Sequence, residues 1–198
     1  MGGLMTAETE HHWPVPPQDG YTVDDLLTLP DLPPHTELLD GSLIFVSPQR
    51  YFHSVVIDFL VNGLRRTVPP ELLVVREMAM AIDERNGPEP DISVVRAVAL
   101  RNDDQAHFQA RDVMLAVEVV SPESEARDRD TKPHKYAGAG IPYFWRVEKA
   151  GAGRRPVVHT YELDMKSRTY HPSGVHHDRL KLATPFDIDI DLAEIEHL

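Results

Sequence analysis

The stretch MLAVEVVSPESEARDRDTKPHKY, residues 114–136, decides the fold. Residues 114–120 are apolar except for Glu118, a pattern typical of a strand that is buried on both faces. A charged segment follows Ser121-Pro122 and leads into a predicted helix at about residues 131–138. A carboxylate inside a buried strand is costly unless it is paired or binds a cation. Glu118 is therefore the first candidate for a functional residue.

Periodic segments on both sides of this strand predict a mixed α/β fold. Thr22 and Asp25 fit a capping box and predict a short helix over residues 22–27. Asp40-Gly41 lies between two apolar runs and predicts a hairpin, and residues 51–66 have apolar positions at helical spacing. Strands are predicted at residues 72–75, 78–82, 91–95, 140–148, 157–163 and 167–171, a loop at residues 101–112, and a closing segment at residues 180–196 with a short helix at residues 192–195.

Composition predicts one globular domain in a chain of 198 residues. Residues 1–20 are rich in Pro, Gly and polar residues, so we expect a flexible N-terminal tail followed by a domain over residues 21–198. There is no cysteine, which excludes disulfides and thiolate chemistry and favours the cytoplasm. No apolar run reaches the roughly 18 to 20 residues that span a bilayer, so no membrane partner is expected.

The formal net charge of −12 counts against an extended nucleic-acid-binding surface, which usually needs a basic face. It is compatible with an acidic pocket that gathers divalent cations. Arginine supplies most of the basic residues, and its guanidinium is the better fork for phosphate. The composition is therefore still compatible with a small local basic patch.

Asp91 is a second carboxylate at the edge of an apolar strand, because it follows Pro90 and opens the run ISVV. If its strand lies beside that of Glu118, the two carboxylates converge on one point. Hard oxygen ligands of this kind suit Mg²⁺ or Mn²⁺. The alternative is that Glu118 pairs with an arginine and Asp91 caps a turn. Spacing alone leaves both interpretations open.

Three segments carry a resemblance to a known family: ELLDGSLIFVSP (37–48), PDISVV (90–95) and VEVVSPESEARDRDTKPHKYAGAGIPYFWRVE (117–148). Together they resemble the Uma2 family, also called DUF820, which belongs to the PD-(D/E)xK restriction-endonuclease-like nucleases. The resemblance extends from about Thr22 to the C-terminus. It implies a restriction-endonuclease-like mixed sheet flanked by helices.

The resemblance also implies roles for individual residues. Asp91 would be the metal ligand of the PD motif, and Glu118 the second acidic ligand, with the backbone carbonyl of Val119 nearby. The parent motif places a lysine two residues after this glutamate, where the present sequence has Val120. In the family the lysine comes from the following helix, and Lys132 matches that position.

Pro133 directly follows the proposed lysine. Proline is tolerated only in the first turn of a helix and disfavours helical angles in the residue before it. With Thr131 as N-cap, Lys132 and Pro133 would be the first two helical residues, which is acceptable. Lys135, one turn later, is the alternative lysine.

Three further positions match the family. Glu37 would be an additional acidic residue that lines the site. For His53, a phosphate contact or water activation competes with a hydrogen-bonded structural role, which we prefer. Tyr136 is expected in the core. Residues 128–130 are expected to be solvated capping residues, because acids favour the start of a helix.

The sequence thus predicts an endonuclease that depends on Mg²⁺ or Mn²⁺ and hydrolyses DNA phosphodiester bonds. Asp91 and Glu118 would hold the metal, and Lys132 would position the water or offset charge on the phosphate. The alternative is a non-catalytic binding or regulatory module on the same scaffold, with a homodimer as one form of it. Val120, Pro133 and the net charge favour this alternative. Metal-dependent hydrolysis of a substrate other than DNA is a third interpretation.

Overall fold

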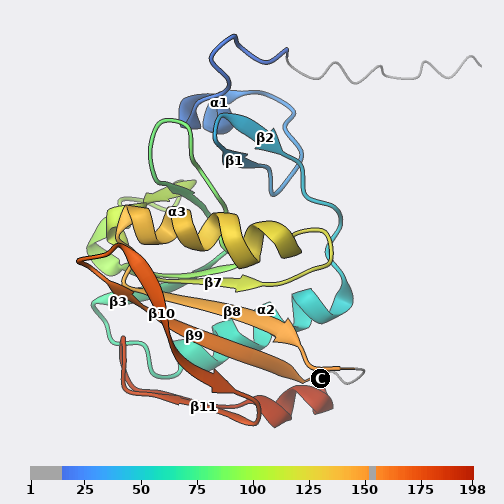
Figure 1. Ribbon diagram of the computed structural model, residues 1–198, viewed down its shortest axis with the longest axis vertical. Coiled ribbons are helices and arrows are strands. Elements are labelled where there is room, and N and C mark those ends of the chain that lie inside the picture. Colours follow the sequence, from blue (N-terminus) through green and yellow to red (C-terminus); the bar gives the residue numbers. More distant parts are fainter. Residues whose placement is uncertain (1–14, 152–154) are drawn as a thin grey trace, which may run out of the picture.

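A six-stranded mixed β-sheet forms the centre of the computed structural model, which describes residues 15–151 and 155–198 (Figure 1). Its strand order is β10-β9-β8-β7-β5-β3. Strands β7 and β8 are parallel, whereas the other neighbouring pairs are antiparallel. The strands are β3 (Leu72–Arg76), β5 (Ile92–Arg96), β7 (Val113–Val119), β8 (Tyr143–Lys149), β9 (Pro156–Asp164) and β10 (Thr169–His176). The predicted α/β fold with a mixed sheet is confirmed.

Strand β7 lies inside the sheet, between β8 and β5. All of its residues except Met114 are buried, as the apolar run predicted. Side chains alternate along a strand, so Leu115 and Val117 belong to the core on one face and Ala116 to the core on the other. Glu118 therefore shares the face of Ala116.

Helices cover both faces of the sheet (Figure 1). Helix α2 (Tyr51–Arg65) packs on one face together with the C-terminal segment, which consists of β11 (Arg179–Leu182), β12 (Ile188–Asp191) and the 3₁₀ helix η4 (Leu192–His197). Helix α3 (Lys132–Ala139) lies over the other face. It forms part of the crossover that two neighbouring parallel strands require. Its position above the face of Glu118 is what builds the site described below.

The N-terminal part of the described chain follows the sequence closely. Helix α1 (Val23–Thr28) begins with the predicted capping box: the Asp25 N–H donates to Thr22 Oγ1 at 3.2 Å, and the Thr22 N–H donates to Asp25 Oδ2 at 2.8 Å. Strands β1 (Glu37–Leu39) and β2 (Ser42–Ile44) form the predicted hairpin. Asp40 and Gly41 both have positive φ angles, 49° and 76°, which is the requirement of a type I′ turn.

The hairpin is tied to the segment that precedes β5. The Leu38 N–H donates to the Gly87 carbonyl at 3.0 Å, and the Gly87 N–H donates back to the Leu38 carbonyl at 2.8 Å. These bonds place Glu37 beside Glu89, whose N–H donates to Glu37 Oε1 at 2.9 Å. Glu37 of the N-terminal hairpin is thereby brought to the segment that precedes β5 of the central sheet.

The prediction of a loop over residues 101–112 is wrong in part. Strand β6 (His107–Gln109) lies in this segment and pairs in parallel with β4 (Ala79–Ala81). The 3₁₀ helices η1 (Ala97–Ala99) and η2 (Ala110–Asp112) flank it. Phe108 is buried in an otherwise polar stretch, and a strand of three residues is too short to show a periodic pattern.

Of the predicted tail over residues 1–20, the first fourteen lie outside the described residues. Within the ranges that are described, no helix is both long enough and apolar enough to cross a membrane.

Candidate functional site

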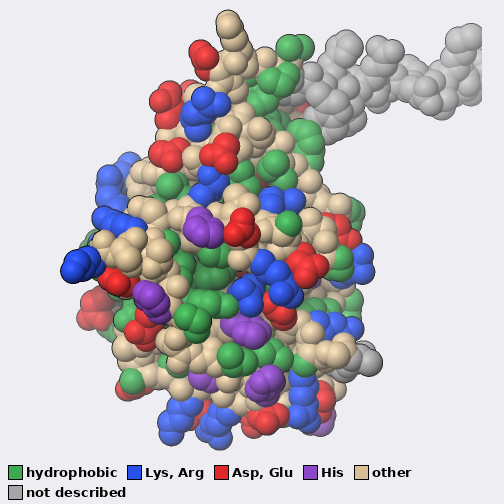
Figure 2. All heavy atoms as spheres, viewed as in Figure 1, with side chains coloured by type: hydrophobic (Ala, Val, Ile, Leu, Met, Phe, Trp, Pro, Cys, Tyr) green, Lys and Arg blue, Asp and Glu red, His purple; other side chains and the backbone are tan. Residues whose placement is uncertain are grey.

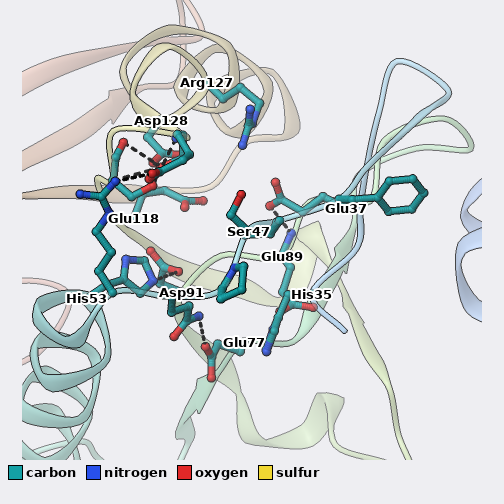
Figure 3. A pocket seen from close by; sticks show the side chains of 18 of the residues that line it. His35, Glu37, Ser47, His53, Glu77, Glu89, Asp91, Glu118, Arg127 and Asp128 are labelled. Carbon is teal, nitrogen blue, oxygen red and sulfur yellow. Dashed lines mark hydrogen bonds and ion pairs between the residues drawn. The ribbon is translucent and has the colours of Figure 1, made fainter. Parts of the chain in front are cut away.

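A cavity of about 200 Å³ opens where the end of β7, the segment before β5 and the start of α2 meet the residues leading into α3 (Figure 3). Asp91, Glu118, Lys132 and Glu37, the four catalytic residues predicted from the sequence, all line it. They come from four different elements of the fold. The structure therefore brings the whole predicted set to one place.

Asp91 is held by the neighbouring strand and by helix α2. Ile92 on β5 is opposite Val117 on β7, so Asp91 lies next to the end of β7. The Val119 N–H donates to Asp91 Oδ2 at 2.6 Å, and His53 Nε2 lies 3.0 Å from Asp91 Oδ1. The strand that follows Asp91 and the strand of Glu118 are neighbours, which is the condition for the two carboxylates to converge. Asp91 bonds across to β7 rather than capping a turn.

Glu118, Glu37 and Asp128 surround the ammonium group of Lys132. Its Nζ lies 2.7 Å from Glu37 Oε1, 3.0 Å from Glu118 Oε2 and 3.5 Å from Asp128 Oδ1. All four residues are buried, with exposed fractions between 1% and 4%. Glu118 is thus paired with a lysine, not with the arginine of the alternative interpretation. One cation faces three carboxylates.

This imbalance shifts the pKa values of the cluster. Burial raises the pKa of Glu118 well above its usual range, and the Lys132 ammonium offsets this only in part. Burial likewise raises the pKa of Asp128, against the opposing effects of Lys132 and a hydrogen bond from Ser124. For Lys132, burial acts to lower the pKa, but Glu118, Glu37 and Asp128 outweigh it and hold the pKa well above its ordinary value. The lysine is therefore charged, whereas burial favours the protonated forms of Glu118 and Asp128.

Tyr136 completes the environment of Glu118. Its hydroxyl donates to Glu118 Oε1 at 2.5 Å, and its ring centroid lies 5.9 Å from that of Phe144. Tyr136 is thus part of the core, as predicted, and also a hydrogen-bond donor to the carboxylate. Because it follows Lys132 by four residues, both side chains lie on one face of α3. A single helix face therefore engages both oxygens of Glu118.

A π-turn over Arg127–Thr131 leads directly into α3. The Lys132 N–H donates to the Arg127 carbonyl, five residues earlier. Thr131 is the N-cap residue of α3, and Lys132 and Pro133 are its first two helical residues, as predicted. Thr131 nevertheless has helical angles, φ −63° and ψ −53°, and its side chain makes no capping bond. A wider turn suits Pro133, which has no N–H and would crowd the carbonyl four residues before it in a regular helix. The proline does not displace the lysine from the site.

The two candidate lysines have different positions. Lys132 is the one lysine among the described residues that line the cavity. Lys135 Nζ instead lies 2.6 Å from Asp40 Oδ1 in the hairpin turn, outside the cavity. The geometry therefore favours Lys132.

Several acidic residues of the site escaped the sequence analysis. Asp128, predicted to be a solvated capping residue, is buried, because the π-turn directs it towards Lys132. Its spacing of four residues from Lys132 was the available signal. Glu77 and Glu89 also line the cavity, and Glu89 Oε1 lies 2.5 Å from His35 Nδ1. Nothing in the local pattern around these two glutamates indicates that they reach the site.

His53 has the hydrogen-bonded role that was preferred. Burial acts to lower its pKa, but the hydrogen bond and charge of Asp91 outweigh burial and raise it. Its Nδ1 is buried and has no hydrogen-bond partner among the described residues. The ring lines the cavity beside Asp91 (Figure 3).

The cavity is strongly acidic. Seven carboxylates line it, from Glu37, Glu77, Glu89, Asp91, Glu118, Glu123 and Asp128, against the permanent cations Arg50, Arg127 and Lys132. Acidic side chains therefore outnumber the permanent cations around the cavity.

The donor chemistry fits a hard divalent cation, which prefers carboxylate and carbonyl oxygens. Asp128 Oδ1 is buried without a hydrogen-bond donor in the described part of the chain. Each oxygen of Glu118 accepts one bond and keeps a second lone pair. Within the described ranges, however, no three His, Asp or Glu side chains are already gathered around one centre. The residues are suited to a metal ion but are not arranged as a closed coordination shell.

Comparison with known proteins places the chain in a family. The model of the Uma2 family, described as "Putative restriction endonuclease", matches residues 23–193. A crystal structure of "a putative nuclease belonging to DUF820" from Anabaena variabilis ATCC 29413 matches with a TM-score of 0.68. The two chains are 16% identical, and the match covers 89% of this chain and 97% of the other, so they share a fold. No curated protein matches the sequence. Because the family model spans most of its length, the chain belongs to the Uma2 family.

Proposed function

We propose that this protein is a metal-dependent endonuclease that hydrolyses DNA phosphodiester bonds. The observation that carries the proposal is the meeting of Asp91, Glu118 and Lys132 in one acidic cavity. Membership of a family described as "Putative restriction endonuclease", and a fold shared with a chain described as "a putative nuclease belonging to DUF820", support a nuclease function. We also propose that the enzyme depends on Mg²⁺ or Mn²⁺ and that its substrate is DNA.

Asp91 and Glu118 would hold the cation, together with the backbone carbonyl of Val119. A bound divalent cation supplies Lewis-acid activation of water and of the phosphoryl oxygen. Lys132, charged at neutral pH, would orient the attacking water or offset negative charge on the phosphate. Glu37 fixes the ammonium group by its own contact of 2.7 Å.

His53 and Tyr136 would act as positioning residues. His53 holds one oxygen of Asp91, and Tyr136 holds one oxygen of Glu118. These bonds restrict the rotation of both carboxylates. The ligands are therefore directed before substrate arrives, which lowers the cost of forming the reactive arrangement.

The test is cleavage of supercoiled plasmid and of short DNA duplexes and single strands, with Mg²⁺, with Mn²⁺ and with chelator. We expect cleavage with either metal and none with chelator. Asp91→Asn, Glu118→Gln and Lys132→Met should each reduce the rate by at least about 100-fold, since removal of one electrostatic group at a transition state costs roughly that much. Asp130→Asn is the matched control, because Asp130 is exposed and does not line the cavity. Cleavage that survives both Asp91→Asn and Glu118→Gln would contradict the site.

The second candidate is a non-catalytic binding or regulatory module. It is favoured by the saturation of Lys132, whose ammonium contacts three carboxylates in the interior. A structural ion-pair cluster has this form. If the purified protein binds neither metal and cleaves no form of DNA, while folding cooperatively, this second function is the correct one.

A further inference from the structure

A second hollow lies beside α3, on the sheet face opposite α2. We call it the aromatic groove, and its volume is about 190 Å³. It lies between α3 and strands β8, β9 and β10, and no carboxylate is among its lining residues. Figure 2 shows hydrophobic side chains in a hollow on this face, with basic and histidine side chains around it. Its principal side chains are Arg129, Arg146, Arg168, Phe144, Tyr161 and Tyr170.

Three aromatic rings form the floor of this groove. Phe144 lies between the other two, with centroid distances of 5.6 Å to Tyr161 and 5.5 Å to Tyr170. The interplanar angles are 30° and 31°, so both tyrosine rings are tilted against Phe144 rather than perpendicular to it. Tyr161 and Tyr170 are partly exposed. Ring faces of this kind are stacking platforms for flat π systems.

Arginines surround the floor with incompletely compensated charge. Arg129 and Arg146 both bind Glu148, and Arg129 also pairs with Glu125. The Arg146 guanidinium lies 5.6 Å from the centroid of the Tyr161 ring. Arg168 is exposed, and no carboxylate pairs with it among the residues that the structure describes. In a chain of net charge −12, such a concentration of arginine suits an anionic ligand.

An intermediate cavity of about 290 Å³ shares lining residues with both the groove and the acidic site. Arg129 lines both the aromatic groove and this intermediate cavity. Arg50 and His53 in turn line both the intermediate cavity and the acidic site. The three cavities therefore follow one another around the start of α3, from the proposed metal ligands to the aromatic groove, through lining residues that neighbouring cavities share.

We propose that the aromatic groove binds a single-stranded segment of the DNA substrate that continues from the acidic site. Bases would stack on Tyr161 and Tyr170, and phosphates would contact Arg168 and Arg129. That the bound strand is the nuclease substrate rests on the proposed function. Binding of single-stranded DNA by the groove does not require that the protein cleaves DNA.

The geometry favours single strands over duplexes. In a duplex, the base faces are stacked on each other and are closed to a protein ring, whereas an unpaired base exposes its π face. The phosphates of a flexible strand can also follow a bent course around a helix end. A rigid duplex, with a persistence length of about 150 base pairs, cannot do so without cost.

The test is fluorescence anisotropy with a labelled oligothymidylate of about 20 nucleotides, in chelator, so that binding is measured without cleavage. We expect Arg168→Glu to weaken binding by about tenfold and to reduce the slope of log affinity against log salt concentration by about 0.7 for each phosphate that the variant no longer binds. Tyr161→Ala should weaken binding by about 5- to 150-fold, the range that corresponds to one unstacked base. Lys166→Glu is the control, because Lys166 lies in the same β9–β10 turn as Arg168 but does not line the groove.

Two outcomes would overturn the inference. One is that Arg168→Glu and Lys166→Glu weaken binding equally, which indicates only a nonspecific effect of charge. The other is that a duplex of the same sequence binds more tightly than the single strand. If Tyr161→Ala does not fold, Arg168→Glu alone decides, since its side chain is exposed. Because binding is measured in chelator, without cleavage, a failure of catalysis and a failure of the groove remain distinguishable.

Discussion

The ammonium group of Lys132 on α3 lies 3.0 Å from the carboxylate of Glu118 on β7, fourteen residues earlier in the chain. The strand itself has Val120 two positions after the glutamate. A helix that crosses the sheet face thus supplies a cation that the strand lacks. This contact depends on the crossover between β7 and β8, which carries α3 over the sheet face of Glu118.

Removal of the lysine should destabilise the fold strongly. Lys132→Met leaves Glu118, Glu37 and Asp128 buried without their cation, and removal of one partner of a buried ion pair costs about 3–5 kcal/mol. Lys135→Met should cost at most about 1 kcal/mol, because its partner Asp40 is exposed. Urea denaturation of both variants measures the difference. Equal destabilisation of the two variants would show that the buried cluster contributes nothing special.

Neutralising Asp128 should change the pH dependence of stability. Burial raises its pKa, so the folded protein keeps this proton to a higher pH than the unfolded chain does. This contribution to stability is present below the ordinary aspartate pKa of about 3.9 and is lost as pH rises through the folded value. Asp128→Asn, which has no proton to lose, should therefore gain stability relative to the wild type as pH rises from about 4 to 7. Free energies of unfolding at several pH values test this, with Asp130→Asn following the wild type; a gain at low pH instead would reverse the sign.

The hydroxyl of Tyr136 should matter more than its ring volume suggests. Tyr136→Phe keeps the packing against Phe144 but leaves Glu118 Oε1 without its donor. An unsatisfied buried acceptor costs about 1–3 kcal/mol. We expect a decrease of this size in the free energy of unfolding, together with slower metal-dependent cleavage at an unchanged position of cutting. A fully stable variant would mean that water replaces the phenol.

Divalent cations should stabilise the protein against heat even without substrate. Seven carboxyl groups line the cavity against three permanent cations, and a cation that binds only the folded state adds about 2.7 kcal/mol at 100 times its dissociation constant. Thermal unfolding of the wild type should therefore shift upwards with Mn²⁺ or Mg²⁺. Asp91→Asn should abolish most of the shift, whereas Asp130→Asn should retain it. An identical shift in all three proteins would place the cation elsewhere.

The sequence indicates features whose causes are local. The Thr22–Asp25 capping box and the Asp40-Gly41 turn depend on residues a few positions apart, and both are present as predicted. The apolar run around Glu118 indicated a buried strand for the same reason. Asp91 was selected because it opens an apolar strand and Lys132 through the family resemblance, and both line the cavity of Glu118.

Features that depend on distant contacts were not predictable. Strand β6 exists because β4 pairs with it, and three polar-flanked residues carry no period of their own. Asp128 was assigned to solvent because acids commonly begin helices, whereas the π-turn directs it inward. Glu77 and Glu89 reach the cavity only through the packing of separate segments.

The sequence by itself determined a buried strand with a carboxylate at its centre and a second carboxylate at the start of another apolar strand. The lysine on the following helix was indicated by the family resemblance. Alternation along strands and the spacing of helical residues are properties of the local chain, so they can be read without coordinates. Only the tertiary structure decided that one ammonium faces three carboxylates and that an arginine-rich aromatic groove adjoins this site. Charge balance and groove shape arise from segments far apart in the chain, and burial strengthens their interactions only once the fold has excluded water.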